Sequence, residues 1–326
     1  MQKREDYLAL SAALRAREPR MLTREKAERA LEAQGFAECA KLLTDCGYED
    51  MSGCSAAAID RILSRTREAI FGELSLQTPA KPLVALFRAK YDYHNAKAVL
   101  KAEAMGSDPL PLMSASGRVA PETMLAAWRE EKLSLLPERL AKAMSEAWAL
   151  LNRSGNPQLA DFVLDRAYFE DLAAGAAERG AFVQGYVALL ADCTNLKSAV
   201  RTMRMGKSAD FLRLALVPGG RLDPERFATA GSEGLAALFN GSALSGAASL
   251  GAAAAEGGGM TAFERACDDA VSEYLHAARL VSYGEEPVVA YLAAVENEIT
   301  AVRMILTGKL AGIAPQSIRE RLRELL

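Results

Sequence analysis

The chain has 326 residues, of which 50% are hydrophobic and 6% aromatic, and its formal net charge is -3. This length can hold two or three domains or one array of large repeats, and the abundance of Ala and Leu favours helices over strands. The near-neutral charge and the lack of a dense basic stripe exclude a typical nucleic-acid-binding protein.

The first third of the chain is expected to be helical. The spacing of apolar residues predicts helices over 7–17, 37–43 and 59–74. Thr23 can cap a further helix, because Glu25 and Glu28 follow in its first turns, where acids interact well with the helix dipole. The N-terminus runs straight into charged residues, unlike a signal peptide, and no run of 18 apolar residues predicts a membrane span.

A long helix is predicted over 83–104, and its pattern occurs three times at intervals of roughly 100 residues, a spacing typical of a repeat protein. In each copy an Asn lies in an otherwise apolar i,i+4 row, a basic residue follows it, and a Gly then stands where a helix C′ glycine is expected. The three sets are Asn95, Lys101 and Gly106; Asn195, Arg201 and Gly206; and Asn297, Arg303 and Gly308.

A second recurring pattern, which we call the box, consists of a hydrophobic residue, a short or capping residue, and a helix start that usually has Pro at its first position. The boxes are Leu22-Thr23-Arg24-Glu25, Val119-Ala120-Pro121-Glu122, Leu222-Asp223-Pro224-Glu225 and Ile313-Ala314-Pro315-Gln316. Because a box opens each unit and a long helix closes it, we expect three units, 1–115, 116–218 and 219–326. The helix from Pro315 is expected to pack against the first unit. No strand is predicted, and the Gly-rich region 229–260 is expected to form short helices with mobile connections.

Few residues suggest chemistry. Gly206-Lys207-Ser208 resembles the end of a phosphate loop, but Arg201 stands at the upstream position where that motif requires a glycine. The end of a helix explains the segment instead, so we expect no nucleotide-binding site. His94 and His276 are the only histidines and belong to no metal-binding motif, so no metal or other cofactor is expected. Glu296 and Glu298 form a pair of carboxylates suited to acid–base work, yet residues two apart on a helix point in different directions, which favours separate packing or salt-bridge roles.

The repeated residues allow two interpretations each. The three Asn residues either form a buried device that fixes how the long helices pack or line a ligand-binding ring. The basic residues Lys101, Arg201 and Arg303 either balance acids on a neighbouring helix or contact a partner protein. No residue is assigned a catalytic role.

Several segments carry a resemblance to a known family. They are Asp92–Lys101, Asn195-Leu196-Lys197, Tyr291–Ile299 with Val302–Lys309, and Ile313-Ala314-Pro315 with Arg319–Leu322. On these segments the chain resembles the C subunit of the V/A-type rotary ATPases of archaea and bacteria, which is equivalent to the d subunit of the eukaryotic vacuolar enzyme.

The resemblance implies an all-α fold of three similar helical domains, arranged as a pseudo-threefold funnel. It implies a non-catalytic socket between the proteolipid rotor ring and the D and F subunits of the central shaft, which transmits torque for proton or sodium transport. Such a protein lies on the cytoplasmic face of the membrane and is held there through the complex only. The alternatives are a helical-repeat scaffold or adaptor of another complex, and an all-α enzyme, which would need a polar cluster that the sequence does not indicate.

Overall fold

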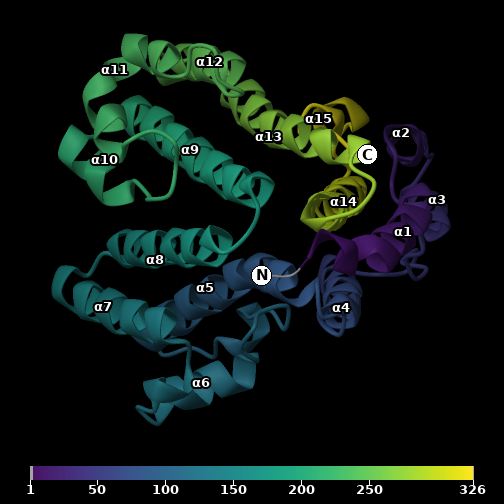
Figure 1. The fold of residues 1–326 in the computed structure, drawn as a ribbon, viewed down its shortest axis with the longest axis horizontal. Coiled ribbons are helices and arrows are strands. Elements are labelled where there is room, and N and C mark those ends of the chain that lie inside the picture. Colours follow the sequence, from purple (N-terminus) through teal and green to yellow (C-terminus); the bar gives the residue numbers. More distant parts are fainter. Residues whose placement is uncertain (1–2, 326) are drawn as a thin grey trace. The chain divides into compact units, whose positions relative to one another are not determined.

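The structure, a computed structural model, describes residues 3–325, in which the regular elements are all helices and none is a strand (Figure 1). The all-α prediction is therefore confirmed. The chain divides into two compact units, one formed by Met1–Leu83 with Gly259–Leu326 and the other by Val84–Gly258. The division into 1–115, 116–218 and 219–326 stays a prediction, as does the funnel.

The first unit is built around one long helix, α14, which spans Glu285–Leu310 and is buried along most of its length. Helices from both ends of the chain pack on it, because its apolar residues cover more than one face and need neighbours on several sides. These helices are α1 (Leu8–Arg17), α2 (Arg24–Glu32), α3 (Phe36–Leu43), α4 (Ala56–Ser75), α13 (Met260–His276) and α15 (Pro315–Arg319).

The second unit starts within the long helix α5 (Lys81–Met105) and contains a second long helix, α9 (Ala181–Arg204). Helix α8 packs against both α7 and α9, and α11 and α12 also lie against α9. The remaining bounds are α6 (Pro121–Arg129), α7 (Glu138–Ser154), α8 (Pro157–Ala177), α10 (Ala209–Ala215), α11 (Pro224–Leu238) and α12 (Ser245–Ala255). Tyr93, Val99 and Leu100 of α5 share a buried core with α6, α7 and α8.

The boxes start helices as predicted. The Thr23 hydroxyl caps α2 by accepting a hydrogen bond from the Lys26 backbone N–H at 3.3 Å. Pro121, Pro224 and Pro315 each occupy the first position of a helix, where a missing N–H costs nothing. Helix α15 contacts α2, as expected, and the Arg319 and Glu28 side chains form an ion pair at 2.8 Å.

Region 229–260 is more helical than its glycines suggest. It contains the end of α11, which is interrupted at Gly231 where φ is 63°, and all of α12. None of the helices in residues 3–325 is both long and apolar enough to cross a lipid bilayer.

Candidate functional site

The candidate site is a set of three acidic joints, in each of which a carboxylate on a long helix accepts a hydrogen bond from at least one backbone N–H group at a box. In the first joint, Asp92 of α5 accepts hydrogen bonds from the backbone N–H groups of Arg118 and Val119, at 2.8 and 3.0 Å. The Arg118 side chain adds an ion pair to the same carboxylate at 2.6 Å. Val119 opens the second box, so this joint ties the first long helix to the second box.

The second joint repeats this geometry 100 residues later. Asp192 of α9 accepts hydrogen bonds from the backbone N–H groups of Arg221 and Leu222, at 3.0 and 3.3 Å. Leu222 opens the third box. In both joints the residue before the arginine is a glycine, Gly117 or Gly220, because a Cβ at either position would overlap the Asp oxygen.

The third joint connects the last long helix to the first box. Glu298 of α14 accepts hydrogen bonds from the Leu22 backbone N–H at 2.8 Å and from the Tyr48 hydroxyl at 2.9 Å. The order of contacts is therefore cyclic: the first long helix holds the second box, the second holds the third, and the third holds the first.

The three joint carboxylates share an electrostatic environment. Burial raises the pKa of Asp92, of Asp192 and of Glu298 above the ordinary values, since it disfavours the charged form. The hydrogen bonds that each carboxylate accepts, and at Asp92 the Arg118 guanidinium, act in the opposite direction.

Two of the predicted asparagines support these joints. Asn95 exchanges two hydrogen bonds with the backbone of Ser114, both at 2.8 Å. Asn195 does the same with Val217, at 2.8 and 2.9 Å. Both Asn residues are fully buried, which favours the packing interpretation for these two positions.

Asn297 differs from the other two. It is only half-buried, and its amide has no hydrogen-bond partner among residues 3–325. The reason is a shift of one helical turn in the third copy. The joint acid precedes the C′ glycine by 14 residues in the pairs Asp92 and Gly106, Asp192 and Gly206, and Glu298 and Gly312. In this register the counterpart of Asn95 is Ala301.

The expectation that Gly308 ends the third helix is therefore wrong. Gly106, Gly206 and Gly312 have φ angles of 64°, 63° and 68° and end their helices, whereas Gly308 lies inside α14. A Cβ at Gly308 would lie 2.6 Å from the Ile318 Cδ1 atom, so this glycine lets α15 approach α14 closely.

Two of the three predicted basic residues, Lys101 and Arg303, form ion pairs within the chain. The Lys101 Nζ atom lies 2.7 Å from Asp161 of α8, and the Arg303 Nε atom lies 2.6 Å from Asp60 of α4. In the corrected register Arg303 corresponds to Lys97, which pairs with Asp165 at 2.6 Å. Arg201 is exposed. A role of these residues in contacting a partner stays a prediction.

The other candidates have local roles. Glu296 lies 3.3 Å from Arg67 of α4, whereas Glu298 faces Leu22, so the expected separate roles are confirmed. The His94 Nε2 atom lies 3.0 Å from the Leu112 carbonyl oxygen, as expected for a locally hydrogen-bonded histidine. Gly206 ends α9, and the Ser208 hydroxyl caps α10, which supports the helix-terminus interpretation of that segment.

Sequence reasoning missed the joint acids. Asp92 and Asp192 both stand three residues before the Asn, and Gly-Arg followed by Val or Leu recurs before the second and third boxes, so the signal was present. Three residues before Asn297 the chain has Ala294 instead of an acid. An alignment on Asn297 therefore does not indicate Glu298 as the third joint acid.

Comparisons with known proteins give a matching family and several relatives. The sequence model of the ATP synthase (C/AC39) subunit family matches residues 10–321. The C subunit of the V-type sodium ATPase of Enterococcus hirae is 22% identical over 326 residues, covering 98% of this chain and 99% of that protein.

Two further relatives belong to ATP synthases. The C subunit of the V-type ATP synthase of Thermus thermophilus is 28% identical over 237 residues, 69% of this chain and 71% of that protein. The C subunit of the A-type ATP synthase of Methanocaldococcus jannaschii is 23% identical over 345 residues, 97% of this chain and 86% of that protein. Because the family match extends from α1 to the end of α15 and includes all three joints, the chain belongs to the ATP synthase (C/AC39) subunit family.

Proposed function

We propose that this chain is a non-catalytic subunit of the central rotor of a V/A-type ATPase or ATP synthase. It acts as a socket of three similar helical domains between the proteolipid ring in the membrane and the D and F subunits of the shaft. It transmits torque between the two and thereby couples ATP turnover to proton or sodium transport. It is held at the cytoplasmic face of the membrane through the complex only.

The family match over residues 10–321 carries this proposal, because it covers nearly the whole chain and all three joints. The matching relatives are named as subunits of a sodium ATPase and of ATP synthases. Membership of this family indicates that the chain is a subunit of a rotary ATPase or ATP synthase. Its position within the rotor is the part that we propose.

The joints suit a part that bears torque. Torque on such a part would make each long helix slide along the box that it contacts. Asp92, Asp192 and Glu298 resist such sliding, since each carboxylate accepts at least two hydrogen bonds in a buried setting. Charge-assisted hydrogen bonds are shorter and stronger than neutral ones, and a close-packed interior deforms little under load.

The joint carboxylates are poorly placed for catalysis. In the first and second joints, both oxygens of each carboxylate already accept protein hydrogen bonds. A general base needs a free oxygen within hydrogen-bond reach of a substrate proton. These acids therefore support a structural role.

The test is purification of the complex from native membranes through an affinity tag on this chain. We expect the proteolipid and the D and F subunits in the purified complex, and no ATP hydrolysis by the isolated chain. An untagged strain gives the background. A stable complex that lacks both kinds of partner would contradict the proposal and favour a scaffold of another assembly. Nucleotide hydrolysis by the pure chain would favour an enzyme.

A further inference from the structure

In all three joints a carboxylate binds the backbone of a box, but the side chains around the carboxylate differ. The first and second joints can be compared most directly, because both lie within the second unit and their long helices align with an offset of 100 residues. The equivalent residues are Arg88 and Ala188, Asp92 and Asp192, Gly117 and Gly220, and Arg118 and Arg221.

In the first joint, the Arg118 side chain connects the box to several helices. Its Nε atom lies 2.6 Å from Asp92 of α5, and its Nη2 atom lies 2.5 Å from Asp171 of α8. Asp171 also accepts a hydrogen bond from the Tyr93 hydroxyl at 3.5 Å and forms an ion pair with Arg139 of α7 at 3.3 Å. One guanidinium therefore ties the residue before the second box to α5, α7 and α8.

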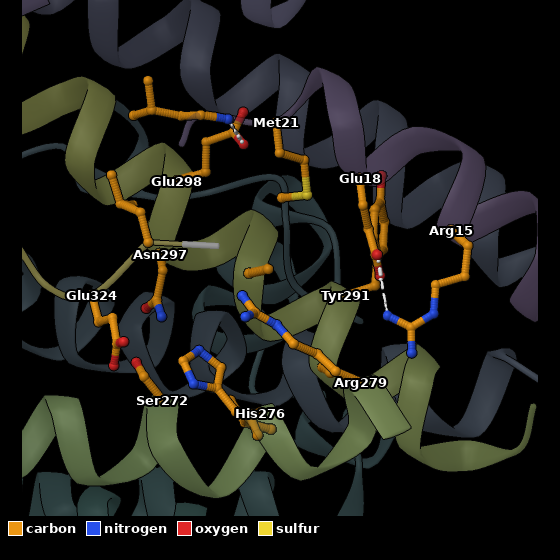
Figure 2. A pocket seen from close by; sticks show the side chains of 15 residues that line it. Arg15, Glu18, Met21, Ser272, His276, Arg279, Tyr291, Asn297, Glu298 and Glu324 are labelled. Carbon is orange, nitrogen blue, oxygen red and sulfur yellow. Dashed lines mark hydrogen bonds and ion pairs between the residues drawn. The ribbon is translucent and has the colours of Figure 1, made fainter. Parts of the chain in front are cut away.

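The third joint, in the first unit, is also reinforced by side chains. Met21 stands directly before the first box, where the first joint has Arg118, and Figure 2 shows it close to Glu298. Met21 is buried, and the buried Tyr48 hydroxyl donates to Glu298 at 2.9 Å. This joint thus has a side-chain donor in addition to the Leu22 backbone.

The second joint has no such reinforcement. Arg221 is exposed, and its side chain has no hydrogen-bond or ion-pair partner in the described part of the chain. Within residues 3–325, Asp192 therefore accepts hydrogen bonds from two backbone N–H groups alone, at 3.0 and 3.3 Å. Hydrogen bonds between charged groups are stronger than those to a neutral amide, so the second joint should open more easily than the first.

The loop before the third box is also more flexible than the loop before the second. The Arg88 Nη1 atom donates to the Gly117 carbonyl oxygen at 2.9 Å, whereas Ala188 has no polar side chain with which to bind the Gly220 carbonyl. Gly219, with a φ of 91°, precedes Gly220, so two successive residues lack a Cβ. Glycine has the widest choice of backbone conformations, so this loop can change its dihedral angles at little cost.

Two contacts limit the part of the chain that can move. Asn195 holds Val217 through two hydrogen bonds, which fixes the beginning of the loop on α9. The Arg204 side chain donates to the Ala254 carbonyl oxygen at 3.0 Å and so holds the end of α12. The flexible stretch is therefore 218–221, and the element that it leads into is the start of α11.

The start of α11 has one further polar link to the preceding helix. Arg213 of α10 forms an ion pair with Glu225 of α11, but the two side chains are 42% and 54% exposed. Exposed ion pairs contribute little to stability, since solvent screens them. Helix α11 is interrupted again at Gly231, so its first half can move without its second half.

We propose that residues 218–221 form a hinge at which the start of α11 moves relative to α9. Arg118 is the positioning residue that prevents the same movement at the first joint. Torque on the chain would then deform the second unit mainly at this hinge. That consequence rests on the proposed function, whereas the hinge itself is a property of the isolated chain and is tested there.

Hydrogen–deuterium exchange of the full-length chain, resolved to single residues, measures how often each joint opens. The Arg118 and Arg221 amides are a matched pair, because each follows a glycine and so has the same intrinsic exchange rate. We expect the Arg221 amide to exchange about tenfold faster than the Arg118 amide, since local openings govern exchange. The amides of α14, in the first unit, give the reference for unfolding of the whole molecule.

Arg118→Leu should make the first joint behave like the second. It removes the bonds to Asp92 and Asp171 but keeps the backbone N–H groups of the joint. After correction for the intrinsic rate, exchange of the Val119 amide should rise about tenfold, while exchange in α14 stays unchanged. If this variant does not fold, Arg88→Ala introduces the residue type of the second copy and should also speed exchange at Val119.

The matched control is Arg221→Leu, which should leave exchange of the Leu222 amide unchanged because the side chain that it removes has no partner among residues 3–325. The proposal is overturned if the Arg118 and Arg221 amides of the wild type exchange at the same rate. It is also overturned if Arg221→Leu changes its joint as much as Arg118→Leu changes the first. An equal rise in α14 would show that Arg118 acts on overall stability and does not position the joint.

Discussion

At the residue scale, Glu298 does with a longer side chain what Asp92 and Asp192 do in the other joints. It bridges the Leu22 backbone and the Tyr48 hydroxyl, and both of these groups are buried. Removing an acceptor from a buried donor costs more than a typical hydrogen bond contributes. Each joint acid is thus a position where truncation and conservative replacement should have different effects.

Glu298→Ala should lower the free energy of unfolding by about 1–3 kcal/mol, because it leaves two buried donors without an acceptor. Glu298→Gln should stay close to the wild type at pH 7. Its amide oxygen can accept from Leu22, and its amide nitrogen can donate to the Tyr48 oxygen. Urea denaturation followed by circular dichroism measures both variants. Equal stability of the Ala variant and the wild type would contradict a role for the joint.

The difference in stability between the wild type and Glu298→Gln should depend on pH. Burial raises the pKa of Glu298 above its ordinary value of 4.5, so the folded state holds its proton to higher pH than the unfolded state does. The contribution is fully present below pH 4.5 and is lost as the pH rises through the raised pKa. The stability of the wild type relative to Glu298→Gln should therefore fall as the pH rises from 4.5 to 7. A flat difference would show that Glu298 is not buried as a titrating acid.

In the corrected register, replacing the three asparagines should not change the stability by the same amount at each position. Asn95→Ala and Asn195→Ala each leave a backbone N–H and C=O without partners, at half-buried Ser114 and at buried Val217, and each should cost about 1–3 kcal/mol. Asn297→Ala removes no hydrogen bond among residues 3–325 and should change stability by less than about 0.5 kcal/mol. Thermal and urea denaturation of the three variants test this order, and equal losses at all three positions would refute the corrected register.

At the scale of elements, Gly308 shows how one residue sets the distance between two helices. Gly308→Ala places a methyl group against Ile318 and should destabilise by about 1–3 kcal/mol through overpacking between α14 and α15. Gly72→Ala is the matched control, since it lies inside α4 with nothing within 4 Å and should stabilise by about 0.5–1 kcal/mol. Opposite signs are expected by denaturation, and two stabilising changes would mean that α15 does not pack closely on α14.

Sequence patterns predicted the helix starts well, because Thr23, Pro121 and Pro315 act through local geometry that needs no tertiary information. They also indicated the burial of Asn95 and Asn195. They failed in the third copy, where Asn297 suggested an alignment that is one turn out of register. The helical period tolerates such a shift, since residues four apart share a face, and only the contacts of Glu298 and the φ of Gly312 reveal it.

At the scale of the whole molecule, the two tryptophans report on one unit only. Trp128 and Trp148 both lie in the second unit, with ring centroids 5.6 Å apart in an edge-to-face arrangement. Tryptophan fluorescence thus follows the second unit, while circular dichroism follows all helices.

Glu298 belongs to the first unit, so Glu298→Ala should make the unfolding transitions seen by fluorescence and by circular dichroism differ. We expect the fluorescence midpoint in urea to stay at its wild-type value while part of the dichroism signal is lost at lower urea. Glu298→Gln serves as the control and should leave both curves unchanged. If the two signals shift together in the Ala variant, the units unfold as one cooperative body.

The contact between Glu298 and Leu22 joins residues that are 276 positions apart, and this separation has a consequence for biosynthesis. At 5–20 residues per second, the ribosome needs roughly 14 to 55 s after making Leu22 before it makes Glu298. During that interval α1–α4 lack α14, the helix on which they pack, whereas the second unit is a continuous stretch that can fold as it emerges. The apolar faces of α1–α4 that pack on α14 therefore stay exposed on the nascent chain until α14 is made. We expect chaperones to bind this protein mainly during that period.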